Sequence, residues 1–250
     1  PPALKGGSPC SPLREDLSSA TTRVFSRHHI ARGDTAPAQS DTHRAPADTM
    51  VPSIYQLKPA FQRLLRPTAG ALFRLGVTAN QVTLLACALS VALGVCLYVA
   101  PVPRAFALLP AWLFVRMALN ALDGMLAREY GQRSNLGAYL NELTDVVSDA
   151  ALYLPFAALL PFDPLWVGAL ILAAALSEMA GVLGQTVGAS RRYDGPLGKS
   201  DRAVLVGALG LAVALWHPLP GWVAGVLPLA VALTALTVVR RVRMGLQELR

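Results

Sequence analysis

The chain has 250 residues, of which 54% are hydrophobic and 15% charged, and its mean hydropathy is +0.45. These values lie outside the range of soluble domains and predict an integral membrane protein. Three cysteines are too few for a disulfide framework or a cysteine-rich metal site. The net charge of +7 flanks apolar segments, and no nucleic-acid-reading motif is present, so nucleic acid is not an expected partner.

Residues 1–49 are rich in Pro, Ser, Thr and Arg and show neither a helical nor an alternating period. This composition predicts a disordered N-terminal extension, and it lacks the apolar core of a signal peptide. Met50 opens a stretch of different composition, so the simplest interpretation is that translation starts there; an Arg-rich targeting tail is the alternative. We therefore expect two parts: a tail over 1–49 and a membrane domain over 50–250.

Apolar residues recur at helical spacing between Ile54 and Leu75, opposite basic ones. This pattern is typical of a short amphipathic helix at a membrane surface, with an ordinary surface helix as the alternative. Pro59 and Pro67 are expected to break the run into pieces.

Six apolar stretches follow, each close to the ~20 residues that cross a bilayer as a helix. They lie at about 81–100, 105–127, 138–160, 165–188, 201–216 and 221–240, and the fifth is short enough to extend upstream. Isolated strands would leave backbone groups unpaired in lipid, so helices are expected. The predicted fold is all-α, with six transmembrane helices.

The Lys and Arg residues predict the orientation of these spans. In a six-span arrangement Arg104 alone falls on one side, and the other side carries Lys58, Arg63, Arg66, Arg74, Arg128, Arg133, Arg191, Arg192, Lys199, Arg202, Arg240, Arg241, Arg243 and Arg250. By the positive-inside rule both termini are cytoplasmic.

Polar residues line one face of the second predicted span and one face of the third. Asn120, Asp123 and Ala127 share a face of the second. The third carries a row of residues four apart, which are Gly137, Asn141, Asp145 and Asp149. Because the connecting loop is short, we expect these helices to be antiparallel neighbours with their polar rows near the cytoplasmic ends.

Two facing rows of carboxylate and amide oxygens suit a hard cation such as Mg²⁺ or Mn²⁺. Gly124 and Ala127 leave room beside them for a ligand. The alternative is that these groups only join the helices, with Asp123 paired to Arg128 or Arg116.

The same residues carry a resemblance to a known family. Asp123-Gly124-x-x-Ala127-Arg128 is followed after eight residues by Gly137, then at four-residue intervals by Asn141 and Asp145. This resembles the signature of the CDP-alcohol phosphotransferase family, Asp-x-x-Asp-Gly-x-x-Ala-Arg, eight residues, Gly-x-x-x-Asp-x-x-x-Asp. The segment from Ala79 to Thr83 also looks like the family's Pro-Asn-x-x-Thr motif, and the resemblance covers roughly residues 50–245.

The resemblance implies a six-helix membrane enzyme, usually a homodimer. Such an enzyme transfers a substituted phosphoryl group from a CDP-alcohol, commonly CDP-diacylglycerol, to an acceptor hydroxyl with release of CMP. It thus implies a phosphatidyltransferase of phospholipid biosynthesis, placed in a bacterial inner membrane. The residues implied to bind the CDP group are Asn80, Thr83, Asp123, Gly124, Ala127, Arg128 and Gly137.

The resemblance further implies that the four signature acids hold two divalent ions and that the last, Asp145, is the base toward the acceptor hydroxyl. The first and third positions are Asn120 and Asn141 here. Asparagine offers one neutral oxygen and offsets no charge, so one or two ions of Mg²⁺ or Mn²⁺ are expected. Asp149, one turn beyond Asp145, is a candidate replacement ligand or else an interhelical hydrogen-bond partner.

The segment 190–202 combines four cations, Arg191, Arg192, Lys199 and Arg202, with glycines and serines. It suits an anionic acceptor such as a sugar phosphate or glycerol phosphate, and a solvated loop following the positive-inside rule is the alternative. Glu178 is a further acid within a span, either functional or bridging helices.

Two other functions compete with an active transferase. The two asparagines could leave a catalytically impaired family member that binds a nucleotide-lipid or regulates. An ion-coupled transporter using Asp123, Asp145 and Glu178 is the third hypothesis, but the chain shows neither an inverted repeat nor broken midplane helices.

Overall fold

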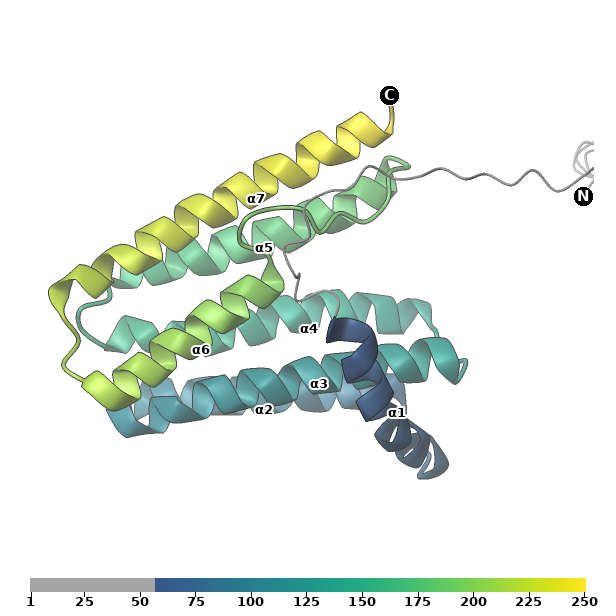
Figure 1. The fold of residues 1–250 in the computed structure, drawn as a ribbon, viewed down its shortest axis with the longest axis horizontal. Helices are drawn as coiled ribbons and strands as arrows, with labels where there is room; N and C mark the ends of the chain where they lie inside the picture. The colour runs from purple at the N-terminus through teal and green to yellow at the C-terminus, as the bar shows by residue number, and fades with distance from the viewer. Residues whose placement is uncertain (1–56) are drawn as a thin grey trace, which may run out of the picture. The chain divides into compact units, whose positions relative to one another are not determined.

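The computed structural model describes residues 57–250, so the expectations for the tail over 1–49 lie outside the described residues. Every regular element within this range is helical (Figure 1). The elements are α1 (Leu57–Arg74), α2 (Ala79–Val99), η2 (Pro103–Ala107), α3 (Leu108–Glu129), α4 (Asn135–Tyr153), η3 (Leu154–Ala158), α5 (Pro164–Thr186), α6 (Lys199–Trp216), η4 (Gly221–Gly225) and α7 (Val226–Glu248).

Side chains that cap the first turn mark where several helices begin. Thr78 caps α2, with Gln81 completing a capping box, and Ser134 and Asp163 cap α4 and α5. At α6 the carboxylate of Asp201 accepts a hydrogen bond from the backbone N–H of Gly198 at 2.9 Å. Each cap satisfies backbone groups that the first helical turn leaves unpaired.

Four of the helical segments are long and apolar enough to cross a membrane: Ala79–Val99, Pro103–Glu129, Pro164–Thr186 and Gly221–Glu248. The predicted spans at 138–160 and 201–216 correspond to α4 and α6, which lie outside this group. The reason is polar residues: α4 carries Glu142, Asp145 and Asp149, and α6 opens with Lys199, Asp201 and Arg202. Length and composition therefore show a multi-pass membrane protein with four such segments.

Three boundaries differ from the sequence prediction. The third predicted span ends as an α-helix at Tyr153 and continues as the 3₁₀ turn η3. The last begins five residues later than 221 and extends to Glu248. The prediction that prolines break 54–75 into pieces is wrong, because α1 is one helix with Pro67 inside it. Proline removes a backbone donor without ending this helix, and α1 is held by packing on α3 through Ala69, Leu122 and Met125.

The helices pack in an order that their sequence order does not reveal. α2 packs against both α3 and α4, whereas α3 and α4 have few direct backbone contacts. The two helices run antiparallel as predicted (Figure 1), and long side chains rather than close backbones join them. α5 and α7 lie side by side, and α6 packs on α3.

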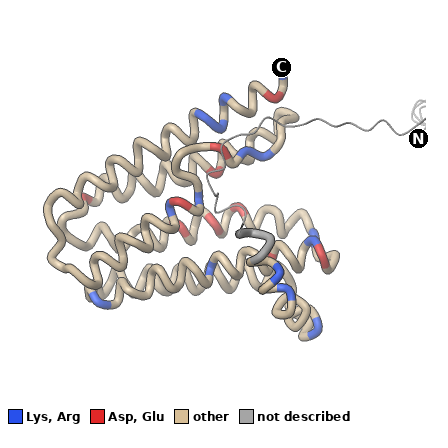
Figure 2. The backbone as a smooth tube through the Cα atoms, in the orientation of Figure 1, with Lys and Arg blue, Asp and Glu red and all other residues tan. Residues whose placement is uncertain are grey.

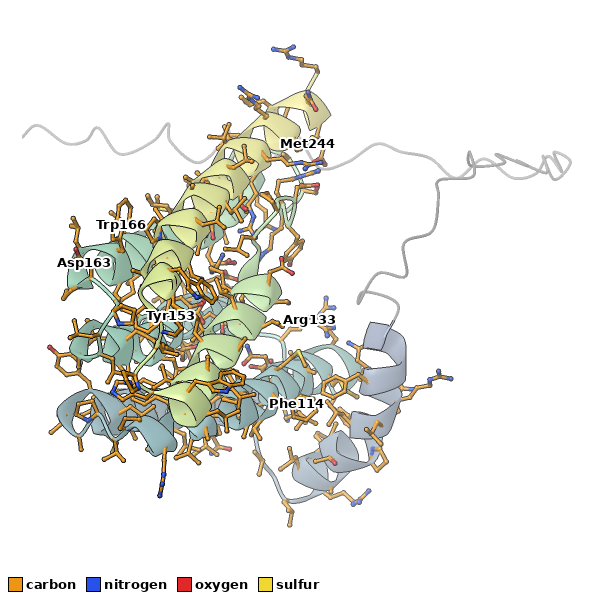
Figure 3. The ribbon with its side chains drawn as sticks, turned by 60° about the vertical axis from the view of Figure 1, so that its left-hand side comes forward. Phe114, Arg133, Tyr153, Asp163, Trp166 and Met244 are labelled. Atoms are coloured by element: carbon orange, nitrogen blue, oxygen red, sulfur yellow. The ribbon has the colours of Figure 1, made fainter. Side chains whose placement is uncertain are left out.

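Apolar and charged residues occupy different ends of the helices. The main apolar core gathers Leu97, Phe106, Leu109, Leu152 and Phe156 at the end where α2 finishes and α3 begins. Acidic and basic residues gather from the middle of the helices to the other end (Figure 2). Figure 3 labels Arg133 and Met244 toward that charged end and Asp163 and Trp166 at the start of α5. This division matches the predicted bias of Lys and Arg to one side.

Candidate functional site

The N-terminal half of α2 contacts the C-terminal part of α3 through a buried hydrogen bond. The hydroxyl of Thr83 donates to Oδ2 of Asp123 at 2.7 Å, and the residue Asp123 is only 6% exposed. The sequence alternative that Asp123 pairs with Arg116 or Arg128 is not what the described residues show, since neither forms an ion pair with it. Thr83 and Asp123, two of the predicted CDP-binding residues, are therefore in direct contact.

The same end of α2 lies against the start of α4. A Cβ added at Gly137 would come within 2.8 Å of Oδ1 of Asn80 and 3.0 Å of Oγ of Ser134. A larger residue at position 137 would therefore displace the side chains of Asn80 and Ser134. Gln132, between α3 and α4, accepts a hydrogen bond from the backbone N–H of Ala79 at 2.7 Å. Three segments of the predicted motif, on α2, α3 and α4, thus meet at one place.

Arg128 lies back along α3 over Gly124. A Cβ at Gly124 would meet the Arg128 guanidinium at 2.9 Å, so this glycine provides the space in which the arginine lies. Arg128 is exposed and Ala127 half-buried. The predicted Gly-x-x-Ala-Arg segment therefore presents a cation at an accessible helix surface beside Asp123.

Asp145 on α4 is held from three directions. Its Oδ1 accepts from Nη2 of Arg116 and from Nδ2 of Asn120, each at 3.1 Å. Its Oδ2 is ion-paired with Nζ of Lys199, the first residue of α6. The side chains of Arg116 and Asn120 bridge α3 to α4 where the two backbones do not pack, so the polar rows do face each other as predicted.

Asp149 lies between arginines of two other helices. Its Oδ1 lies 2.5 Å from Nη1 of Arg116, and its Oδ2 lies 3.7 Å from Nη2 of Arg202. Buried charges of this kind persist only when paired, because desolvation of a lone charge is costly. This geometry favours the interhelical alternative for Asp149, and its role as a metal ligand stays a prediction.

Glu178 on α5 connects three helices. Its Oε1 lies 2.9 Å from Nη2 of Arg202 and 3.5 Å from Nη1 of Arg241 on α7. Ser177 accepts from Arg202 through its hydroxyl and from Arg241 through its carbonyl. Glu178 therefore bridges helices. Sequence reasoning missed Arg241 as its partner, although an arginine inside an apolar run is a signal that could have indicated it.

Of the predicted acceptor cations, Arg191 and Arg192 lie between α5 and α6, whereas Lys199 and Arg202 lie in the first turn of α6, and each is ion-paired. Arg191 pairs with Glu142 on α4, and its guanidinium lies 5.2 Å from the ring centroid of Tyr193. Burial lowers the pKa of Arg191, but the hydrogen bonds and charge of Glu142 outweigh burial and keep the pKa above its ordinary value. Arg192 instead pairs with Asp194 and Glu248, toward the exposed end.

The predicted residues are not all joined. Asn141, half-buried, donates to its neighbour Glu142 at 3.3 Å. Thr83 and Asp123 form one hydrogen-bonded pair and Asn120 and Asp145 another, and Asn120 precedes Asp123 by about one turn of α3. Residues 57–250 include no group of three or more His, Cys, Asp or Glu residues placed to hold a metal.

This donor set fits a magnesium-type ion of low protein coordination. Mg²⁺ is commonly bound by one or two carboxylates, with waters and substrate phosphates completing the octahedron. Asp123 and Asp145 supply two carboxylates, and the amides of Asn120 and Asn141 supply neutral oxygens. These donors suit an ion whose coordination is completed by oxygens of a bound substrate.

A helical membrane protein with paired acids and amides on two facing helices is the class that this fold and site define. The chain belongs to the CDP-alcohol phosphatidyltransferase family, whose model matches residues 76–240. The family assignment from the signature is thereby confirmed.

Two relatives show the range of similarity. The inner membrane protein YnbA of Escherichia coli K12 is 52% identical over 170 residues, which cover 68% of this chain and 83% of that protein. The phosphatidylinositol phosphate synthase of Mycobacterium tuberculosis H37Rv is 37% identical over 97 residues, covering 38% of this chain and 43% of the synthase.

Solved structures share the fold. The M. tuberculosis phosphatidylinositol phosphate synthase with CDP-DAG bound aligns with a TM-score of 0.62 at 22% identity, covering 73% of this chain and 94% of that one. The same synthase in complex with manganese and citrate aligns with a TM-score of 0.60 at 24% identity, covering 72% and 87%. These alignments show that the helices are arranged alike.

Proposed function

We propose that this protein transfers a phosphatidyl group from a CDP-alcohol, of which CDP-diacylglycerol is the expected one, to the hydroxyl of a polar alcohol. CMP is released, and the product is a phospholipid. The observation that carries the proposal is the contact of Thr83 with Asp123 beside Asn80 and Gly137, with Asp145 opposite on α4. Three distant stretches of the family signature meet there.

The proposed donor site consists of the residues around this contact. Gly137 and Gly124 leave the space, and the exposed guanidinium of Arg128 is free to pair with a donor phosphate. Thr83 orients one oxygen of Asp123, so the other oxygen is available to a ligand. The remaining residues of the proposed site are Asn80, whose amide lies against α4, and Ala127, whose small side chain leaves the helix surface open.

The proposed cofactor is Mg²⁺ or Mn²⁺, held by Asp123 and Asp145 with the amide oxygens of Asn120 and Asn141. Such an ion, when bound, supplies stabilisation of the negative charge that develops on the phosphoryl oxygens and the leaving group. The support for this cofactor is the oxygen donor set of the chain and the manganese complex of the M. tuberculosis synthase.

Asp145 is the proposed base. The acceptor oxygen attacks the phosphorus that carries the diacylglycerol, the bond from that phosphorus to the CMP oxygen breaks, and the hydroxyl proton passes to Asp145. Arg116, Asn120 and Lys199 hold this carboxylate in place and stabilise its ionised form. An ionised carboxylate has about four lone-pair sites, so three donors still leave it able to accept a proton.

The proposed acceptor is anionic, and its subsite is formed by Arg191, Arg192, Lys199 and Arg202. Arg202 supports this, since its Nε is buried without a hydrogen-bond partner in the described part of the chain. That donor is left for an acceptor oxygen. Arg191 is held by Glu142 and only partly covered, so it is able to exchange one partner for another.

We further propose that α4 and α6 complete six spans, with α1 on the cytoplasmic surface and both termini in the cytoplasm. The charged end of the helices supports this orientation (Figure 2). A homodimer in a bacterial inner membrane is the proposed assembly and location, supported by the inner-membrane location named for YnbA.

Release of CMP tests the proposal. Purified protein is incubated with Mg²⁺ or Mn²⁺, CDP-diacylglycerol and a panel of alcohols and alcohol phosphates. Asp123→Asn and Asp145→Asn should each abolish release while leaving the protein folded and monodisperse. Release that neither substitution changes would refute the site.

A second candidate function is a catalytically impaired member that binds a nucleotide-lipid without turnover. The asparagines at positions 120 and 141 and the pairing of Asp145 with two cations favour it. Tight binding of CDP-diacylglycerol with no CMP released for any acceptor would establish this function instead.

A further inference from the structure

Lys199 pairs with Asp145, the carboxylate proposed to bind a metal ion. It opens α6, and its Nζ is ion-paired with Oδ2 of Asp145, whose Oδ1 faces Arg116 and Asn120. The side chains are 30% and 14% exposed, so the pair is largely shielded from water. Both oxygens of the proposed base therefore already have a positively charged partner from the chain itself.

The charges around this pair balance without any metal. Four carboxylates, those of Asp145, Asp149, Glu142 and Glu178, are ion-paired with five cations, Arg116, Arg191, Lys199, Arg202 and Arg241. The fifth carboxylate, Asp123, is buried and hydrogen-bonded to Thr83, and the exposed Arg128 is the cation assigned above to the donor phosphate. A net charge inside a membrane protein is costly, so such a balance is what a stable cluster requires.

A donor pyrophosphate carries one negative charge on each phosphate, so one divalent cation bound with it leaves this balance unchanged. A second divalent cation would add two positive charges that neither the chain nor the donor offsets. Carboxylates at positions 120 and 141 would supply that offset, but both residues are neutral amides here. The charge of the site thus matches one divalent ion.

We propose that Lys199 is a resident cation that takes the place of a second metal ion on Asp145, so that the chain binds one divalent ion and not two. The amide of Asn120 supports this division, because its Nδ2 donates to Asp145 and its oxygen remains for the ion beside Asp123. The inference rests on the proposed donor site and assigns its metal count and the role of Lys199.

Counting bound Mn²⁺ tests the inference without relying on turnover. The full chain, purified in detergent and stripped of metal, is titrated with Mn²⁺ alone, and free Mn²⁺ is read by electron paramagnetic resonance. The variants are Asn120→Asp with Asn141→Asp, the same pair with Lys199→Met, and the pair with Lys199→Arg, which keeps the cation. Arg192→Met in the same background is the matched control, since Arg192 pairs only near the exposed end.

The wild type should bind one Mn²⁺ per chain. The double Asn→Asp variant should bind a second ion weakly, and adding Lys199→Met should tighten that second ion at least tenfold, whereas Lys199→Arg and Arg192→Met should not. Two ions of similar affinity on the wild type, no ion at all, or a second ion indifferent to Lys199→Met would overturn the inference. Absence of CMP release with one bound Mn²⁺ would refute the transferase and leave the metal count standing.

Discussion

Replacement of Gly94 by alanine tests the helix packing on which the site depends. Gly94 lies on α2 against α4, and a Cβ there would come within 2.6 Å of the carbonyl carbon of Ala151 and closer still to its oxygen. The obstacle is backbone, so no side chain can rotate away. The two helices must move apart by about 1 Å to restore ordinary contact.

The expected cost follows from overpacking. Such insertions destabilise by about 1–3 kcal/mol, and in a chain of this size each kcal/mol lowers the unfolding midpoint by roughly 2–4 °C. Because α2 and α4 also carry Asn80 and Gly137, CMP release should fall as well. The midpoint is measured by heating purified protein and following the monodisperse peak on size-exclusion chromatography.

Gly168→Ala is the matched control. Gly168 lies inside α5, and a Cβ there would meet nothing within 4 Å. Alanine is the better helix former, so this variant should be as stable as the wild type or more so by about 0.5–1 kcal/mol. Equal midpoints for Gly94→Ala and the wild type would refute the packing of α2 on α4 described above.

Three further predictions concern the site. Thr83→Val should raise the Mg²⁺ concentration for half-maximal CMP release about tenfold, because a hydrogen bond to charged Asp123 is worth about 1.5–3 kcal/mol. Thr83→Ser keeps the hydroxyl and should leave that concentration unchanged. The same Mg²⁺ requirement in Thr83→Val and in the wild type would argue against the hydrogen bond. Arg202→Met should lower the free energy of unfolding by about 3–5 kcal/mol, because Glu178 loses a buried partner. Adding Glu178→Gln should recover part of this loss. An unfolding midpoint that Arg202→Met leaves unchanged would exclude the buried pair. Arg191→Met should raise KM for a phosphorylated acceptor about tenfold and leave the donor KM unchanged, whereas a change confined to the donor would move Arg191 to the other subsite.

Buried ion pairs join α3, α4, α5, α6 and α7 at their charged end. Arg116 joins α3 to α4, and Arg202 joins α6 to both α4 and α5. Arg241 adds α7 through Glu178. Asp149 and Glu178 each have more than one arginine partner, so removal of one leaves a buried carboxylate with fewer cations around it. Single substitutions here should therefore cost more than loss of an exposed pair such as Arg66 with Glu129.

The amino-acid sequence alone determined the class of protein and the order of its parts. Hydropathy and helical spacing are local properties, and the spans predicted from them agree within a few residues with α2, α3 and α5. They also predicted that Asn120 of α3 faces the row containing Asp145 of α4, which the hydrogen bond between them shows, because helical spacing determines the direction of a side chain. The signature spacing then predicted the family that residues 76–240 confirm.

Only the tertiary structure determined which charged side chains form ion pairs. Lys199 reaches Asp145 and Arg241 reaches Glu178 across more than fifty residues, and no local pattern contains those distances. Arg241 reaches Glu178 because α7 packs along α5. The contact of α2 with α4 depends in turn on Gly94, where the two backbones touch. The sequence gives the charge of each side chain. Whether opposite charges pair depends on the helix packing that brings them together in one low-dielectric volume.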